Sequence, residues 1–254
     1  MEEINYFQYI MPRTFAIGDI HGAQKALEQL LGRLDLQRED RLIFLGDYVD
    51  GWSQSAGVIG YLMELSKCRD CIFIKGNHDA WCESWLSGDI ADAEWLLHGG
   101  LETVKSYAVV SVEERKRHLL FFNGLRNYYI DAAARRLLVH AGFTSMHGPE
   151  AEYYESSFYW DRTLWEVALA VDQKIGRQSK LYPQRLLLFD EIIIGHTPTL
   201  NYDMEIPMHA CNVWNIDTGA GFKGRLTAMD IHTKQYWQSD PVQQLYPKEK
   251  GRNR

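Results

Sequence analysis

The chain has 254 residues, of which 46% are hydrophobic and 24% charged, a globular composition that excludes a disordered, collagen-like or coiled-coil protein. Acidic residues outnumber basic ones by 34 to 27, which gives a formal charge of -7. Proteins that bind nucleic acid by neutralising phosphates usually have a basic excess, so we expect no nucleic-acid partner.

The N-terminus and the cysteines predict a soluble, cytoplasmic protein. Residues Met1 to Ile4 include two acids where a secretory signal needs positive charge, and no apolar run approaches the roughly 18 residues of a membrane span. Four cysteines are too few for a disulfide-stabilised scaffold in a chain of this length. We therefore expect reduced thiols, a cytoplasmic location and no membrane partner.

Three strand-then-helix units open the chain. Short apolar runs lie at residues 14–17, 42–45 and 71–74. Helical periodicity follows each run. The first expected helix covers 23–34, the second begins near residue 53 and ends at 65, and the third begins at about residue 80. This alternation predicts parallel β-α-β architecture and an α/β fold.

The remainder of the chain has a less regular pattern. We expect mostly helix over 90–125 and 150–188, and a hairpin from the runs at 128–130 and 136–139. Further short strands are predicted near 192–194, 212–216, 224–230 and 235–238. No linker divides the chain, so the prediction is one domain over 1–254 with a largely helical insertion or lid at about 80–188. The basic tail of Lys248, Lys250, Arg252 and Arg254 is expected to be solvated.

Five of the strand-like runs end in residues of metal-ligand type beside glycine. The motifs are GDIHG at 18–22, GDYVDG at 46–51, GNHD at 76–79, VHAG at 139–142 and GHTP at 195–198. In an α/β sheet, sites form at the carboxyl ends of strands, where residues far apart in sequence meet. The five motifs therefore predict one shared site.

The donors in these motifs are oxygen and imidazole nitrogen, with no thiolate. That set suits Mn, Fe or Zn in an open catalytic site better than a structural zinc. The candidate ligands are Asp19, His21, Asp47, Asn77, His140 and His196. These are more ligands than one tetrahedral ion binds. We therefore expect two divalent metals bridged by one carboxylate. His78 and Asp50 remain, and a histidine oriented by a carboxylate is the usual form of a general acid.

The ordered set of motifs resembles the phosphoprotein phosphatase (PPP) family of calcineurin-like metallophosphoesterases, and is most similar to its bacterial and bacteriophage members and to symmetrical diadenosine tetraphosphatases. The resemblance implies a sandwich of two mixed sheets flanked by helices. It also implies that Asp19 and His21 hold the first metal, that Asp47 bridges, and that the second metal is held by Asn77, His140 and His196. His78 would be the general acid and Asp50 its partner.

One position departs from the family pattern. Family members carry a phosphate-binding arginine directly after the second acid of the Gly-Asp-x-x-Asp motif, whereas this chain has Gly51 there. Arg162, in a Trp-x-Arg stretch like that of bacterial members, is the candidate for a second phosphate-binding arginine; the alternative is an exposed helix residue. Asp50 could instead cap the following helix, and Asp217 either orients a ligating histidine or caps its own turn.

The resemblance implies a metal-dependent phosphatase, a hydrolase in which a metal-bound hydroxide attacks phosphorus in line while His78 protonates the leaving group. Manganese is favoured as the metal, with iron or zinc as alternatives. A phosphomonoester, such as phosphoserine or phosphothreonine on a protein, is the first expectation for the substrate, and a diadenosine polyphosphate or another nucleotide is the alternative. A second alternative, raised by Gly51, is an inactive module that binds phosphorylated partners.

Overall fold

The computed structural model describes residues 12–253. The acidic N-terminal residues Met1 to Ile4 and the last tail residue, Arg254, lie outside the described part of the chain.

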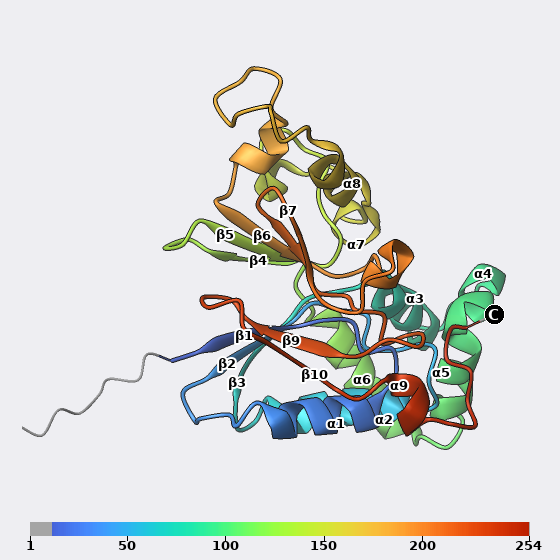
Figure 1. The fold of residues 1–254 in the computed structure, drawn as a ribbon. Coiled ribbons are helices and arrows are strands. Elements are labelled where there is room, and N and C mark those ends of the chain that lie inside the picture. The colour runs from blue at the N-terminus through green and yellow to red at the C-terminus, as the bar shows by residue number, and fades with distance from the viewer. Residues whose placement is uncertain (1–11, 254) are drawn as a thin grey trace, which may run out of the picture.

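Two five-stranded sheets pack face to face (Figure 1). The first has the order β10-β9-β1-β2-β3, in which β1, β2 and β3 are parallel, β9 is antiparallel to β1, and β10 is antiparallel to β9. Its strands are Thr14–Ile17 (β1), Arg41–Phe44 (β2), Asp70–Phe73 (β3), Thr227–Asp230 (β9) and Tyr236–Gln238 (β10). The predicted α/β fold with two mixed sheets is confirmed.

The second sheet has the order β4-β5-β6-β8-β7, in which β5, β6 and β8 are parallel and the two outer strands antiparallel. Its strands are Tyr128–Asp131 (β4), Arg136–Val139 (β5), Glu191–Ile194 (β6), Met208–Ala210 (β7) and Val213–Asn215 (β8). Strand β7 was not predicted, because its three residues give no readable alternation.

Alternation along the strands explains the layered architecture. Ala16, Ile43 and Leu138 point into a core between the two sheets. Their neighbours Phe15 and Leu137 belong to two other cores, each formed between a sheet and its helices. Successive side chains of a strand point to opposite faces, and both faces of the central strands are covered. This is why these runs are almost wholly apolar.

Helices cover the outer face of each sheet (Figure 1). The first sheet carries α1 (Gln24–Arg33), α2 (Ser55–Leu65), α3 (Asn77–Leu86), α5 (Leu101–Tyr107) and α6 (Val112–Asn123), with the short α4 (Ala93–Trp95) leading into α5 and α9 (Val242–Leu245) near the end of the chain. The second sheet carries α7 (Ser157–Trp160) and α8 (Thr163–Ala170). Among the described residues, no helix is both long and apolar enough to cross a bilayer.

The range predicted as a helical insertion, about 80–188, has a mixed structure. It contains α4 to α8, but also β4 and β5, which belong to the second sheet. The expectation of mostly helix over 150–188 is wrong beyond Ala170, where only a short 3-10 helix at Gln184–Leu187 occurs. The long loop lacks the continuous apolar periodicity that would stabilise a helix. The single-domain assignment stays a prediction.

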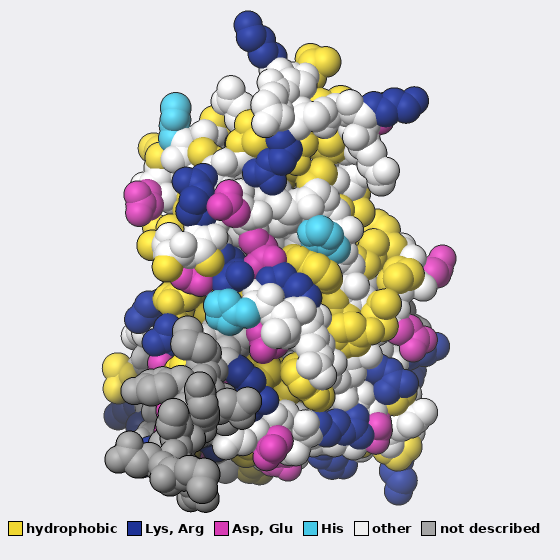
Figure 2. All heavy atoms as spheres, turned by 60° about the vertical axis from the view of Figure 1, so that its left-hand side comes forward, with side chains coloured by type: hydrophobic (Ala, Val, Ile, Leu, Met, Phe, Trp, Pro, Cys, Tyr) yellow, Lys and Arg dark blue, Asp and Glu magenta, His cyan; other side chains and the backbone are white. Residues whose placement is uncertain are grey.

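On the face shown in Figure 2, basic and acidic side chains are interspersed.

Candidate active site

Each motif residue lies just beyond the carboxyl end of a strand. Asp19 follows β1, Asp47 follows β2, and Asn77 follows β3 at the start of α3. From the second sheet, His140 follows β5 and His196 follows β6. All of these side chains, together with His21, Asp50 and His78, are buried. The packing of the two sheets therefore brings five separate segments of the chain to one end of the sandwich.

Four of these residues adopt a left-handed backbone conformation that side chains other than glycine rarely take. The φ angles are 53° at His21, 53° at Asp47, 73° at Asp50 and 68° at His196. Such conformations cost about 1–3 kcal/mol each and persist only where the surroundings enforce them. Their concentration here is typical of a functional site.

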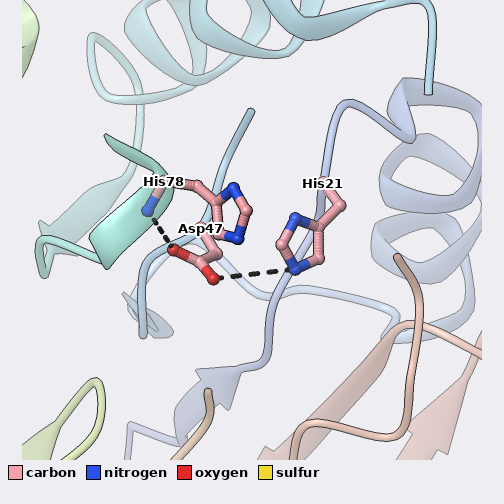
Figure 3. Close-up of side chains that lie close together, drawn as sticks. All are labelled: His21, Asp47 and His78. Atoms are coloured by element: carbon pink, nitrogen blue, oxygen red, sulfur yellow. Dashed lines mark hydrogen bonds and ion pairs between the residues drawn. The ribbon is translucent and has the colours of Figure 1, made fainter. Parts of the chain in front are cut away.

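The first group of possible ligands consists of His21, Asp47 and His78 (Figure 3). The Nε2 atom of His21 lies 3.6 Å from Oδ2 of Asp47. The backbone N–H of His78 donates to Oδ1 of Asp47 at 3.0 Å, which orients the carboxylate.

The second group consists of Asp47, His140 and His196, so Asp47 belongs to both. The Nε2 atom of His140 lies 3.5 Å from Oδ2 of Asp47 and 3.2 Å from Nδ1 of His196. The Oδ1 atom of Asn77 lies 2.9 Å from that same Nδ1 atom and 3.2 Å from Nε2 of His140. The structure thus brings together Asn77, His140 and His196, the residues predicted to hold the second metal, beside the carboxylate of Asp47.

Hydrogen bonds to backbone carbonyls set the tautomers of two of these histidines. The Nδ1 atom of His140 lies 2.9 Å from the oxygen of Leu45, and that of His21 lies 3.2 Å from the oxygen of Val49. A carbonyl only accepts, so each Nδ1 carries the hydrogen, and burial lowers the pKa of both imidazoles and keeps them neutral.

Each Nε2 therefore presents a lone pair toward Asp47, and that of His21 also lies 3.1 Å from Nη1 of Arg252. Lone pairs facing a carboxylate are unfavourable unless a positive charge lies among them. The guanidinium supplies such a charge only at His21, whereas divalent ions would supply it at both histidines, so the residues present fit divalent metal ions.

Asp19 is placed differently from the other predicted ligands. Its carboxylate is buried but belongs to neither group. Both of its oxygens accept from the backbone N–H of His196, at 3.3 and 3.1 Å. Asp19 therefore links β1 to the loop after β6, and its role as a ligand of the first metal stays a proposal.

His78 forms a short hydrogen bond with Asp50, at 2.6 Å between Nδ1 and Oδ2. Two further side chains hold Asp50: Trp95 donates Nε1–H to Oδ2 at 2.7 Å, and Thr103 donates its hydroxyl to Oδ1 at 2.6 Å. Burial raises the pKa of Asp50 to about 7, although these hydrogen bonds oppose the shift. Sequence reasoning missed Trp95 as part of the site and did not single out Thr103, because neither residue lies in or near a motif.

Arg162 and Asp217 are also located. Arg162 directly precedes α8, and its Nε–H donates to Nε2 of His196 at 3.2 Å. Asp217 accepts from the N–H of Gly219 at 3.0 Å. It therefore caps its own turn, which is one of the two roles expected for it from the sequence. Its buried Oδ2 atom has no hydrogen-bond partner among the described residues.

A pocket of about 270 Å³ opens beside the two groups of ligands. Its lining combines site residues with aromatic and charged side chains, and consists of Asn77, His78, Trp81, Glu94, His98, Trp160, Arg162 and Arg252. Trp81 contacts Trp160 edge to face, with ring centroids 4.9 Å apart. The pocket therefore offers both guanidinium groups and aromatic surface to a ligand.

Asp79 stabilises the loop that carries Asp47. It lies in the first turn of α3, and its carboxylate accepts from three backbone amides. The N–H of Asp47 and that of Gly76 donate to Oδ2 at 2.7 and 2.8 Å, and the N–H of Tyr48 donates to Oδ1 at 2.9 Å. The loop after β2 is thereby attached to the start of α3.

We expect Asp79→Asn to lower the free energy of unfolding by about 2–4 kcal/mol, because an amide nitrogen would replace an oxygen that accepts from buried N–H groups. Urea denaturation measures the change. Glu113→Gln, which removes an exposed acid on α6, is the matched control and should alter stability by less than about 0.5 kcal/mol. Equal stability of the two variants would contradict the role of Asp79.

The fold and the site together define a metal-dependent phosphoesterase. The family model of calcineurin-like phosphoesterases matches residues 12–214. The chain belongs to this family, and it is a hydrolase that acts on phosphoric ester bonds.

Several known proteins are similar over almost the whole chain. A symmetrical bis(5'-nucleosyl)-tetraphosphatase from Xylella fastidiosa is 22% identical, over 87% of this chain and 88% of its own length. Serine/threonine-protein phosphatase 1 from Salmonella typhimurium is 26% identical, over 86% of this chain and 91% of its own. A solved structure described as that of a candidate diadenosine tetraphosphatase superposes with a TM-score of 0.61 at 16% identity, covering 91% of this chain and 94% of that one, and shows the shared fold.

Proposed function

We propose that this chain hydrolyses phosphoric esters at a site for two divalent ions. The proposed ligands are Asp19, His21, Asp47, Asn77, His140 and His196. Ions bound there would supply Lewis-acid stabilisation of charge on the phosphoryl oxygens. Manganese remains the first proposal for the metal, with iron or zinc as alternatives, because the donors are oxygen and imidazole nitrogen.

The observation that carries this proposal is the position of Asp47 between two sets of histidines. Its Oδ2 atom lies within 3.6 Å of Nε2 of both His21 and His140. A carboxylate that faces imidazole lone pairs from two sheets is the arrangement that a bridging ligand requires.

His78 is the proposed general acid. Because Asp50 engages its Nδ1 atom, Nε2 is the atom left to give a proton to the leaving oxygen. Burial lowers the pKa of His78, and so does the nearby charge of Arg252, whereas the carboxylate of Asp47 opposes the shift by favouring the protonated imidazole. Trp95 and Thr103 fix the carboxylate of Asp50, so they act as positioning residues for this proton transfer.

The sequence leaves two substrate classes open, a phosphorylated protein and a nucleotide. The lining of the pocket favours the nucleotide. Trp81, His98 and Trp160 line it next to Arg162. Aromatic rings stack on nucleobases, and arginine binds phosphate with charge-assisted hydrogen bonds. The names of the tetraphosphatase relatives support the same choice. We therefore propose a dinucleoside polyphosphate such as diadenosine tetraphosphate.

Phosphoserine or phosphothreonine on a protein remains the second candidate. The relative from Salmonella typhimurium named serine/threonine-protein phosphatase 1 supports it, at an identity as high as that of the tetraphosphatases. The two candidates are separated by comparing kcat/KM of the manganese-loaded protein for diadenosine tetraphosphate with that for a phosphothreonine peptide. A higher value for the peptide would overturn the nucleotide proposal.

We expect Trp160→Ala to raise KM for diadenosine tetraphosphate about 10-fold, because base stacking contributes about 1–3 kcal/mol per base. The KM for β-glycerophosphate, which has no ring, should stay within about twofold. Tyr154→Ala is the matched control, since Tyr154 is an exposed aromatic residue that does not line this pocket. An equal effect of Trp160→Ala on both substrates would show that Trp160 does not bind a base.

A further inference from the structure

The C-terminal segment returns to the active site. After α9 the chain runs along α5 and ends beside α4 (Figure 1). The ring of Tyr246 stacks on Trp52 with centroids 5.2 Å apart, and Glu249 accepts from the backbone N–H and the hydroxyl of Ser53 at 3.0 and 2.8 Å. The backbone N–H of Arg252 donates to the oxygen of Gly221 at 2.8 Å. The expectation of a wholly solvated basic tail is therefore wrong for this segment, because it packs against the loop after β2.

Three glycines make room for the side chain of Arg252. A Cβ atom placed on Gly51 would lie 2.9 Å from its Cγ, and one on Gly221 would lie 3.1 Å from its Cδ. A Cβ atom on Gly99 would lie 3.3 Å from the same Cγ. Distances this short are rare or absent for real Cβ atoms. The side chain of Arg252 thus lies across the space into which a side chain at position 51 would extend.

The guanidinium of Arg252 points into the pocket that holds the catalytic groups. Its Nη1 atom lies 3.1 Å from Nε2 of His21, and it lines the pocket together with Asn77, His78 and Arg162. The ring of Phe222 lies 5.0 Å from its Cζ atom.

Among residues 12–253, the buried Nε atom of Arg252 has no hydrogen-bond partner, and the guanidinium contacts the imidazole of His21 rather than a carboxylate. A partly buried cation whose donor is unpaired is unfavourable, and an anion bound in the pocket would satisfy it.

We propose that Arg252 binds the phosphate of the substrate, as a second guanidinium beside Arg162. The proposal rests on the proposed function, since it assigns a further substrate-binding residue to the same site. The C-terminal segment then supplies the charge that Gly51 cannot. A guanidinium offers several N–H donors in a planar fork, which matches the oxygens of a phosphoryl group. Two such groups lining one pocket suit a substrate with more than one negative phosphate oxygen.

The test measures the affinity of the manganese-loaded full chain for inorganic phosphate by calorimetry. Arg252→Ala should weaken this affinity by about 10- to 100-fold, as expected for the loss of charge-assisted hydrogen bonds. The phosphate affinity of Arg252→Lys should lie between those of the wild type and Arg252→Ala, because lysine keeps the positive charge but lacks the planar set of N–H donors. Free guanidinium added to Arg252→Ala should restore part of the affinity. Lys250→Ala removes an exposed charge from the same segment and should leave the affinity unchanged.

The outcomes separate this proposal from the proposed function. If the wild type turns over phosphoesters and Arg252→Ala keeps its phosphate affinity and its kcat/KM within twofold, Arg252 does not bind substrate. An equal loss in Lys250→Ala would assign the effect to the general charge of the segment and would also overturn the proposal. If the wild type shows no turnover but Arg252→Ala still weakens phosphate binding, the proposed function fails and the assignment of Arg252 stands. Thermal unfolding checks that the variants are folded. If Arg252→Ala does not fold, the same comparison is made with Arg252→Lys.

Discussion

Asp47→Asn is expected to lower metal-dependent turnover by about 10³-fold or more. Both groups of possible ligands share Asp47, so a weaker ligand at this position affects both ions at once. Metal ions supply several kcal/mol of transition-state stabilisation, and each 1.4 kcal/mol corresponds to about a tenfold change in rate.

The asparagine variant is well suited to this test because it removes the negative charge of Asp47 and replaces only its Oδ2 atom. An amide oxygen at the Oδ1 position still accepts from the N–H of His78, while the negative Oδ2 atom near His21 and His140 is lost. Turnover of p-nitrophenyl phosphate with added manganese measures the rate, and elemental analysis measures the metal bound per chain.

The matched control is Asp190→Asn, because Asp190 is exposed and its surface ion pair with Arg135 contributes little. Its rate and metal content should equal those of the wild type. Wild-type turnover by Asp47→Asn, with the metal content also unchanged, would refute the bridging role of Asp47.

His78→Ala should have the second-largest effect, and its size should depend on the leaving group. A general acid contributes about 10²- to 10⁴-fold, so we expect kcat for an alkyl phosphate to fall within that range. The 4-nitrophenolate ion is a stable anion that leaves without a proton. For p-nitrophenyl phosphate the loss should therefore be no more than about tenfold.

The same variant tests whether His78 is instead a metal ligand, since it lies within the first group of possible ligands. Elemental analysis should find the metal content unchanged in His78→Ala. Asp50→Asn should give a smaller loss with the same dependence on the leaving group, because Asp50 acts through His78. Equal losses on both substrates, or the loss of one metal ion, would rule out the role of a general acid.

Much of the site could be predicted from the positions of polar residues at the ends of apolar runs. Parallel strands place their carboxyl ends at the same edge, so Asp19, Asp47 and Asn77 had to lie near one another once the strands were recognised. His140 and His196 follow parallel strands of the other sheet in the same way. The pairing of the two sheets could not be read from the sequence, because the apolar runs are alike on both faces.

The parts that could not be predicted depend on contacts between distant segments. Trp95 and Thr103 hold Asp50 across more than 40 residues of sequence. Arg252 lies 231 residues from His21, and nothing in the composition of the tail distinguishes it from Lys248 or Lys250. Such side chains reach the site only because helices pack where their apolar faces can be buried, which no local spacing encodes.

The sequence by itself determined the chemistry of this protein: which donors are present, that they follow strands, and that His78 and Asp50 accompany them. These follow from residue type and from the period of the apolar pattern, both of which are local properties. The tertiary structure decided which groups face one another, and so placed Asp47 between two sets of histidines and Arg252 beside Gly51. The reason is that packing fixes distances between segments, whereas the sequence fixes only their order along the chain.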